Sequence, residues 1–241
     1  MKLKVLGSSS KGNGYVLEDE NVAIILECGV PLDEVKKALN FNISKIDSVL
    51  LSHSHGDHNK YVKEYLKAGL KVYASPETIQ ESEVSSHNWK PVEAGEITKC
   101  RSFTFNAFDL KHDVRCYGYL INTNDNNKFC FITDTHYIGY KFDGLTNIII
   151  ECNFSDEILD ARTGIIEKVR KRIVTSHLSY DLCKDFLKNQ DLRKVHNIVL
   201  VHLSDQNSNA KQFAQQIKKL TGKTVYAAEP GMTINFSKNP F

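Results

Sequence analysis

Apolar residues recur along this chain in short runs that alternate with longer segments of mixed polarity. Short apolar runs bounded by glycine, proline or polar residues predict β-strands, and apolar residues three or four positions apart predict helices. The predicted strands cover residues 2–6, 15–18, 22–27, 46–51, 70–74, 103–108, 116–122, 128–133, 147–152 and 197–201, with two more near Val225 and Thr233. The predicted helices cover 31–40, 59–68, 76–84, two pieces within 155–172, 180–188 and 209–220.

Strand-rich and helical stretches occur in both halves of the chain, and no short repeat or proline-rich linker separates them. Strands that bury one face against each other and the other face under helices form an α/β sandwich. The predicted fold class is therefore an αββα sandwich, in a single domain that spans residues 1–241. The polar segments 85–100 and 123–127 are expected to be irregular and a turn, respectively.

The net charge of the 241-residue chain is only +2. A protein that grips a long nucleic-acid backbone usually carries a stronger basic excess. The charge therefore favours a small substrate, although it leaves nucleic acid open as a partner. No apolar run approaches the ~20 residues that span a bilayer, and the N-terminus is too quickly polar for a signal peptide. A cytoplasmic protein with no membrane partner is expected, with its six cysteines reduced, most of them in the core.

The segment after the predicted strand 46–51 concentrates four possible metal ligands, His53, His55, Asp57 and His58. Side chains two positions apart in an extended segment point the same way, so His53 and His55 can face one ion. Gly56 permits a turn, after which Asp57 and His58 can face a second ion. Imidazole and carboxylate groups bind zinc, manganese and iron. The alternative is a histidine-rich surface loop, and the spacing at a strand end favours the metal site.

Three further ionisable residues follow predicted strands: His112, Asp134 and His202. Each alone is typical of a hydrogen-bonded loop residue. Strand ends at one edge of a sandwich can converge, however, so these residues and the first four make one candidate site of seven ligands. The segment 7–14, rich in glycine and serine, is expected to be a loop, either an anion-binding loop or a plain turn.

These motifs together resemble the phosphodiesterase branch of the metallo-β-lactamase superfamily, which includes tRNA 3′-processing endonucleases. The resemblance rests on His-x-His-x-Asp-His, Thr133-Asp134-Thr135 and Val201-His202-Leu203-Ser204. The segment 7–14, Glu151-Cys152-Asn153 and His177-Leu178-Ser179 are similar to the YycJ/WalJ-type nucleases in particular. Phage cyclic-nucleotide phosphodiesterases that disarm the Pycsar defence are similar in size and motif order. The resemblance covers essentially the whole chain.

The resemblance implies two divalent metal ions, Zn²⁺ or alternatively Mn²⁺. The first ion would be held by His53, His55 and His112, and the second by Asp57, His58 and His202. Asp134 would bridge them. The ions would generate a hydroxide that attacks the phosphodiester, and Asp57 would orient it or accept a proton.

His177 resembles the histidine that contacts the phosphate or protonates the leaving oxygen in the tRNA-processing relatives, a role that suits an imidazole. The alternative is a histidine that only packs at the start of a helix, where Ser176 or Ser179 would be the cap. A homodimer is also implied, because relatives in this branch often pair and place loops of one chain over the site of the other.

Two features qualify this picture. The superfamily commonly has aspartate where this chain has Glu27, which puts the geometry around the metal histidines in question. The basic cluster Lys168, Arg170, Lys171 and Arg172 precedes His177. Such a run is more often a solvated helix face than a phosphate contact.

Four functions compete. The first is hydrolysis of a small cyclic nucleotide, favoured by the near-neutral charge and by the lack of an insertion long enough to grip RNA. The second is a DNA or RNA exonuclease or processing nuclease, favoured by the similarity to the YycJ/WalJ-type group. A β-lactamase, lactonase or thioesterase is permitted by the fold but disfavoured by the segments around His177 and His202. A module with a vestigial site is disfavoured because all seven ligand positions are filled.

Overall fold

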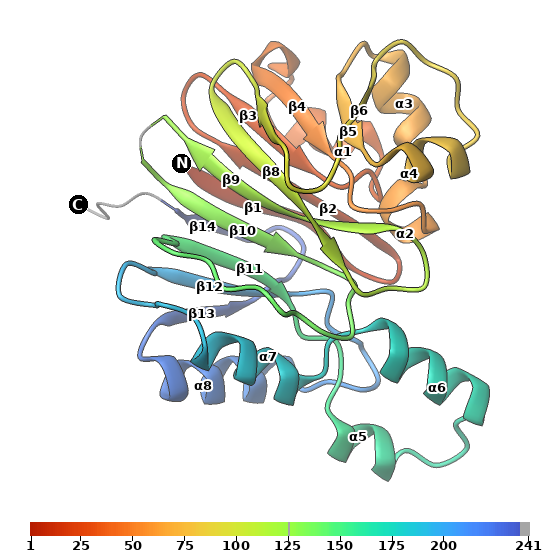
Figure 1. Cartoon of the computed structure of the whole chain (residues 1–241), viewed down its shortest axis with the longest axis vertical. Coiled ribbons are helices and arrows are strands. Elements are labelled where there is room, and N and C mark those ends of the chain that lie inside the picture. The colour runs from red at the N-terminus through yellow and green to blue at the C-terminus, as the bar shows by residue number, and fades with distance from the viewer. Residues whose placement is uncertain (125, 237–241) are drawn as a thin grey trace.

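Two mixed β-sheets packed face to face form the centre of the computed structural model, which describes residues 1–124 and 126–236 (Figure 1). The first sheet has the strand order β14 (Thr233–Asn235), β1 (Lys2–Ser9), β2 (Gly12–Glu18), β3 (Ala23–Leu26), β4 (Ile46–Leu50), β5 (Val72–Ala74) and β6 (Trp89–Pro91). The second has the order β13 (Thr224–Ala227), β12 (Asn197–Val201), β11 (Asn147–Glu151), β10 (Lys128–Ile132), β9 (Cys116–Thr123), β8 (Phe103–Leu110) and β7 (Ile97–Lys99).

Helices cover the outer faces of both sheets (Figure 1). The first sheet carries α1 (Leu32–Ala38), α2 (Gly56–Asn59), α3 (Val62–Lys67) and α4 (Pro76–Glu81), with a 3₁₀ turn at Ile43–Lys45. The second carries α7 (Tyr180–Lys188) and α8 (Ala210–Thr221). Two further helices, α5 (Asp156–Ala161) and α6 (Glu167–Ser176), project from the sandwich. The predicted αββα sandwich is confirmed.

Three apolar layers account for this arrangement. Leu3, Phe105 and Phe131 belong to the layer between the two sheets. Val35 and Tyr65 join the first sheet to α1 and α3, and the side chains of α7 and α8 pack on the second sheet in the same way. The strand β11 contributes to two layers, because Ile149 faces the first sheet whereas Ile148 and Ile150 face the helices. This explains why three consecutive isoleucines are all fully buried.

The segment 7–14 is mostly β-strand, which corrects the prediction of a loop. Strand β1 continues to Ser9 and β2 begins at Gly12, so that only residues 10 and 11 form the turn. The glycines are required by close packing instead: a Cβ atom on Gly7 would lie 2.4 Å from the Gly12 carbonyl oxygen. Gly29 is equally constrained, since a Cβ there would lie 1.8 Å from the Asp57 carbonyl oxygen.

Other predicted boundaries also change. The segment 85–100 contains β6 and β7, two edge strands of three residues each that are too short to show an apolar pattern. The predicted helix 59–68 is present as the shorter α3, and the single helical turn α2 before it was not predicted as a helix. The second helical piece of 155–172 continues to Ser176, so His177 ends α6 rather than starting the next helix. Residue 125 of the predicted turn and residues 237–241 of the predicted domain lie outside the described residues.

Candidate metal centre

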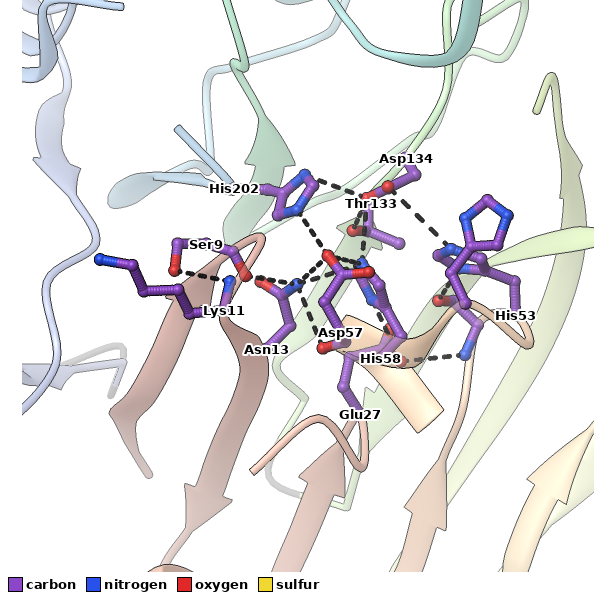
Figure 2. A network of polar contacts seen from close by, with 12 residues as sticks. Ser9, Lys11, Asn13, Glu27, His53, Asp57, His58, Thr133, Asp134 and His202 are labelled. Carbon is purple, nitrogen blue, oxygen red and sulfur yellow. Dashed lines mark hydrogen bonds and ion pairs between the residues drawn. The ribbon is translucent and has the colours of Figure 1, made fainter. Parts of the chain in front are cut away.

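The seven predicted ligands are brought to one edge of the sandwich by the ends of strands. β4 leads into the segment with His53 and His55, and α2 directly after it carries Asp57 and His58. β8, β10 and β12 lead to His112, Asp134 and His202. β10, β11 and β12 are parallel, so their carboxyl ends lie at the same edge of the second sheet, where side chains can converge. Figure 2 shows His53, Asp57, His58, Asp134 and His202 directed toward one another.

The described side chains form four overlapping groups that could hold an ion; two contain Asp134 (with His53 and His58, or with Glu151, His177 and His202), and the other two are groups of three. One ligand atom from each of His53, His55 and His112 lies within 4.8 Å of the others. The same is true of Asp57, His58 and His202. These are the groups that the resemblance assigns to the first and the second ion.

Asp134 lies between the two groups and is almost completely buried. Its Oδ1 is 3.3 Å from His58 Nε2 and 3.2 Å from His202 Nδ1, both in the second group. Its Oδ2 is 4.0 Å from His53 Nε2 and 3.9 Å from His112 Nε2, both in the first group. One carboxylate therefore presents one oxygen to each group.

The chemistry of this cluster fits metal ions. His53 Nε2 is buried and has no hydrogen-bond partner among the described residues, whereas His53 Nδ1 lies 2.8 Å from Ser52 Oγ. An unsatisfied buried polar atom costs roughly 1–3 kcal/mol, and an ion facing Nε2 would remove that cost. Burial, assisted by the neighbouring His58, holds the pKa of His53 well below its ordinary value. The imidazole of His53 is therefore neutral, as a metal ligand must be. Burial also tends to lower the pKa values of His58 and His202, but Asp134 outweighs burial and raises both pKa values, so a metal ion would displace their protons. The donor set can bind metal ions.

Asp57 also faces a cavity of about 240 Å³ next to this cluster. Burial alone would raise the pKa of its carboxyl group, but hydrogen bonds from His202 and His58 hold the pKa far below its usual range. The distance between His202 Nε2 and Asp57 Oδ2 is 3.1 Å. Asp57 is thus an ionised carboxylate, positioned to orient a water molecule or to accept its proton.

His177 lines the same cavity and is held by a carboxylate for which the sequence analysis gave no role. Its Nδ1 lies 2.7 Å from Glu151 Oε1. Burial tends to lower the pKa of His177, but the Glu151 carboxylate outweighs this effect and raises the pKa above that of an ordinary histidine. Glu151 therefore favours the protonated form of His177.

Glu151 is the last residue of β11 and is fully buried. Besides His177, its Oε1 lies 3.1 Å from His202 Nδ1, and its Oε2 accepts hydrogen bonds from the backbone N–H groups of Leu178 and Thr135. Burial raises the pKa of this carboxyl group, but the charge of His177 outweighs it and lowers the pKa. A carboxylate at the end of an apolar strand is the same pattern that singled out Asp134.

Two residues of the first sheet region, Glu27 and Asn13, contact side chains of the group formed by Asp57, His58 and His202. Glu27 is fully buried, accepts a hydrogen bond from the Ser52 backbone N–H, and places Oε2 3.5 Å from His58 Nδ1. Glu27, although one methylene longer than the aspartate common in the superfamily, therefore still lies close to the ligand His58. Asn13, also missed at the sequence level, donates from Nδ2 to Asp57 Oδ2 over 3.3 Å. Glu27 and His202 both have positive φ angles, of 70° and 53°, and such strained residues cluster at functional sites.

The basic cluster of residues 168–172 is not a single surface. Arg172 lines the cavity, together with Val169 and Ile173 of the same helix. Arg170 is instead paired with Asp160 on α5. Most of this basic cluster is therefore a solvated helix face. Of its members, Arg172 lines the cavity.

Comparison with known proteins gives the same picture. The model of the β-lactamase superfamily domain matches residues 32–202, which include all seven predicted ligands. The chain is 26% identical over 231 residues to exodeoxyribonuclease WalJ from Streptococcus pneumoniae, covering 88% of this chain and 85% of WalJ.

Two solved structures share the fold. The metallo-β-lactamase fold protein YhfI from Bacillus subtilis has a TM-score of 0.70 at 17% identity, with 97% of this chain and 99% of YhfI covered. The short form of human tRNase Z has a TM-score of 0.68 at 17% identity, with 98% and 100% covered. Within the part of the chain that the structure describes, no helix is both long enough and apolar enough to span a membrane.

Proposed function

This chain belongs to the β-lactamase superfamily, and on that basis we propose that it is a metal-dependent phosphodiesterase that hydrolyses a 3′,5′-cyclic mononucleotide. The observation that carries the proposal is the position of Asp134, with one oxygen toward each of two groups of ligands. The proposed cofactor is a pair of Zn²⁺ ions, with Mn²⁺ as the alternative. His53, His55 and His112 would hold one ion, Asp57, His58 and His202 would hold the other, and Asp134 would be a ligand of both.

When bound, two such ions supply an activated water molecule at neutral pH and neutralise the charge of the phosphoryl oxygens. The protein's own groups then divide the proton transfers. Asp57, ionised and facing the cavity, accepts the proton of the attacking water. As the phosphorus–oxygen bond to the leaving group breaks, His177 donates its proton to the leaving oxygen.

A small substrate is supported by two features. The cavity beside the ligands measures about 240 Å³, below the ~300–1,000 Å³ of most ligand pockets. The net charge of the chain is only +2, which leaves little excess charge for a long phosphate backbone. The homodimer and the role against a nucleotide-based phage defence remain predictions from the resemblance, and the cytoplasmic location remains a prediction from the hydrophobic pattern of the sequence.

A second candidate function is an exonuclease. It is favoured by the similarity to WalJ, since the alignment covers 85% of a protein named as an exodeoxyribonuclease. Removing a terminal nucleotide would use the same ligands and the same proton transfers, with the rest of the strand outside the cavity.

Salt dependence separates the two candidates. A cyclic mononucleotide carries one phosphate, so its hydrolysis should change by no more than about threefold between 50 and 200 mM salt, whereas strong multi-phosphate binders lose roughly 10³–10⁵ in affinity over this range. We expect hydrolysis of at least one cyclic nucleotide to a linear monophosphate, and slower turnover of long single strands. The assay compares both substrates at equal phosphate concentration. Fast, salt-sensitive degradation of DNA or RNA, with cyclic nucleotides untouched, would establish the exonuclease instead.

A further inference from the structure

The helix α6 has an apolar stripe that the protein core does not use. Ile166, at the start of the helix, and Val169 and Ile173 within it are spaced three and four positions apart, which places them on one face. Ile166 and Val169 are 69% and 45% exposed, and Ser176 is the one buried residue among those described in α6. An amphipathic helix normally buries such a stripe against the core. Here α6 projects from the sandwich instead (Figure 1).

Two residues of the stripe, Val169 and Ile173, face the candidate metal centre. Val169, Arg172 and Ile173 form one wall of the 240 Å³ cavity, and Asp57, Asp134 and His177 belong to the rest of its lining. The polar side chains of the lining can contact a phosphate group and accept or donate protons. The α6 wall offers two branched apolar side chains, which suit a flat ring better than a phosphate, and one guanidinium, which can stack on such a ring or pair with a phosphate.

We propose that this wall of α6 is a platform for the nucleobase next to the reacting phosphate. Val169 and Ile173 pack against the face of the ring, and the Arg172 guanidinium stacks on it, as arginine does on bases in nucleic-acid complexes. The inference rests on the proposed function, and it names the substrate class more closely: a nucleotide with its base, rather than any phosphodiester. It applies equally to a cyclic nucleotide and to the terminal nucleotide of a strand.

Binding of adenosine 5′-monophosphate and of ribose 5-phosphate to the metal-loaded protein tests the platform. The two ligands share the sugar and the phosphate and differ by the base. Titration calorimetry should show adenosine 5′-monophosphate binding at least about 10-fold more tightly. The double variant Val169→Ala/Ile173→Ala should weaken that binding about 10-fold, because it removes apolar carbons that contact the ring, and should leave ribose 5-phosphate unchanged. Alanine favours helix formation, so α6 should persist.

Val174→Ala is the matched control. It makes the same change as Val169→Ala in the same helix, but Val174 does not line the cavity and is partly exposed. It should leave the affinity for both ligands unchanged. Equal affinity of the wild-type protein for the two ligands, no binding of either, or an equal loss for both in the double variant would overturn the platform.

Two further measurements separate this inference from its alternatives. If light scattering shows that the double variant, but not Val174→Ala, dissociates a dimer while base preference is unchanged, the stripe is an interface between two copies and the platform is wrong. Hydrolysis is assayed independently with a panel of phosphodiesters. Preference for the base-bearing ligand without turnover of any phosphodiester would contradict the proposed function and support the platform alone.

Discussion

Asp134→Ala is expected to lower the rate of phosphodiester hydrolysis by more than ~10³-fold, because removing a single group that stabilises transition-state charge already costs ~10²–10³-fold. Asp134 lies within 3.3 Å of two nitrogens of one ligand group and within 4.0 Å of two nitrogens of the other. If the site holds two ions as proposed, losing Asp134 would remove a ligand from both. Rates and metal content should be measured on the same preparations, and the metal content should fall with the rate.

Asp205→Ala provides the control for Asp134→Ala. Asp205 follows the same strand end as His202, but its side chain is 74% exposed and contacts Lys11 rather than a ligand. Its replacement should leave both rate and metal content unchanged. Near-normal hydrolysis by a folded Asp134→Ala protein with a full metal complement would show that this carboxylate does not join the two groups.

Glu151→Gln is expected to lower the rate by ~10²–10⁴-fold, the range typical of general acid–base groups, and His177→Ala by a similar factor. Glu151 is fully buried and lies 2.7 Å from His177 Nδ1 and 3.1 Å from His202 Nδ1, so we expect it to position both imidazoles and to charge that of His177. The rate of the double variant Glu151→Gln/His177→Ala should be only slightly lower than the rate of either single variant. When two residues act as one unit, removing one of them already removes most of the contribution of both. We expect Asp134→Ala to lower the rate of phosphodiester hydrolysis more than His177→Ala does.

The pH profile distinguishes this role from a purely structural one. The pKa of His177 is raised because Glu151 faces it, so the protonated acid is present below that raised pKa and is lost as the pH increases through it. In Glu151→Gln the pKa of His177 falls, and the alkaline limb of the rate profile should therefore move to lower pH. An unchanged alkaline limb, or losses that multiply in the double variant, would mean that His177 and Glu151 act separately.

Much of this architecture follows from the sequence because its hydrophobic pattern is strong. Consecutive apolar residues such as Ile148, Ile149 and Ile150 occur where both faces of a strand are covered, and polar ligands follow directly where such strands end. The edge strands β6 and β7 escaped prediction because three residues are too few to show a period. The segment 7–14 was misread because glycine serves close packing as well as turns, and sequence alone does not tell Gly7 beside Gly12 from a flexible loop.

The predicted ligands could be selected one by one from their strand ends, but their grouping depends on tertiary structure. That Asp134 turns one oxygen to each group, or that Glu151 contacts both His177 and His202, depends on distances between segments far apart in the chain. The position of α6 beside the cavity was hidden for the same reason. Its apolar residues look like core residues in the sequence, and only the fold shows that they face the cavity.

The central claim is that this cluster holds two metal ions that the hydrolysis requires. The most direct measurement is elemental analysis of protein purified without chelator and then equilibrated with Zn²⁺ or Mn²⁺, alongside its rate of phosphodiester hydrolysis. We expect two ions per chain, loss of hydrolysis when a chelator removes them, and recovery when either metal is restored. Fewer than one ion per chain, with hydrolysis that neither chelator nor added metal affects, would contradict the account.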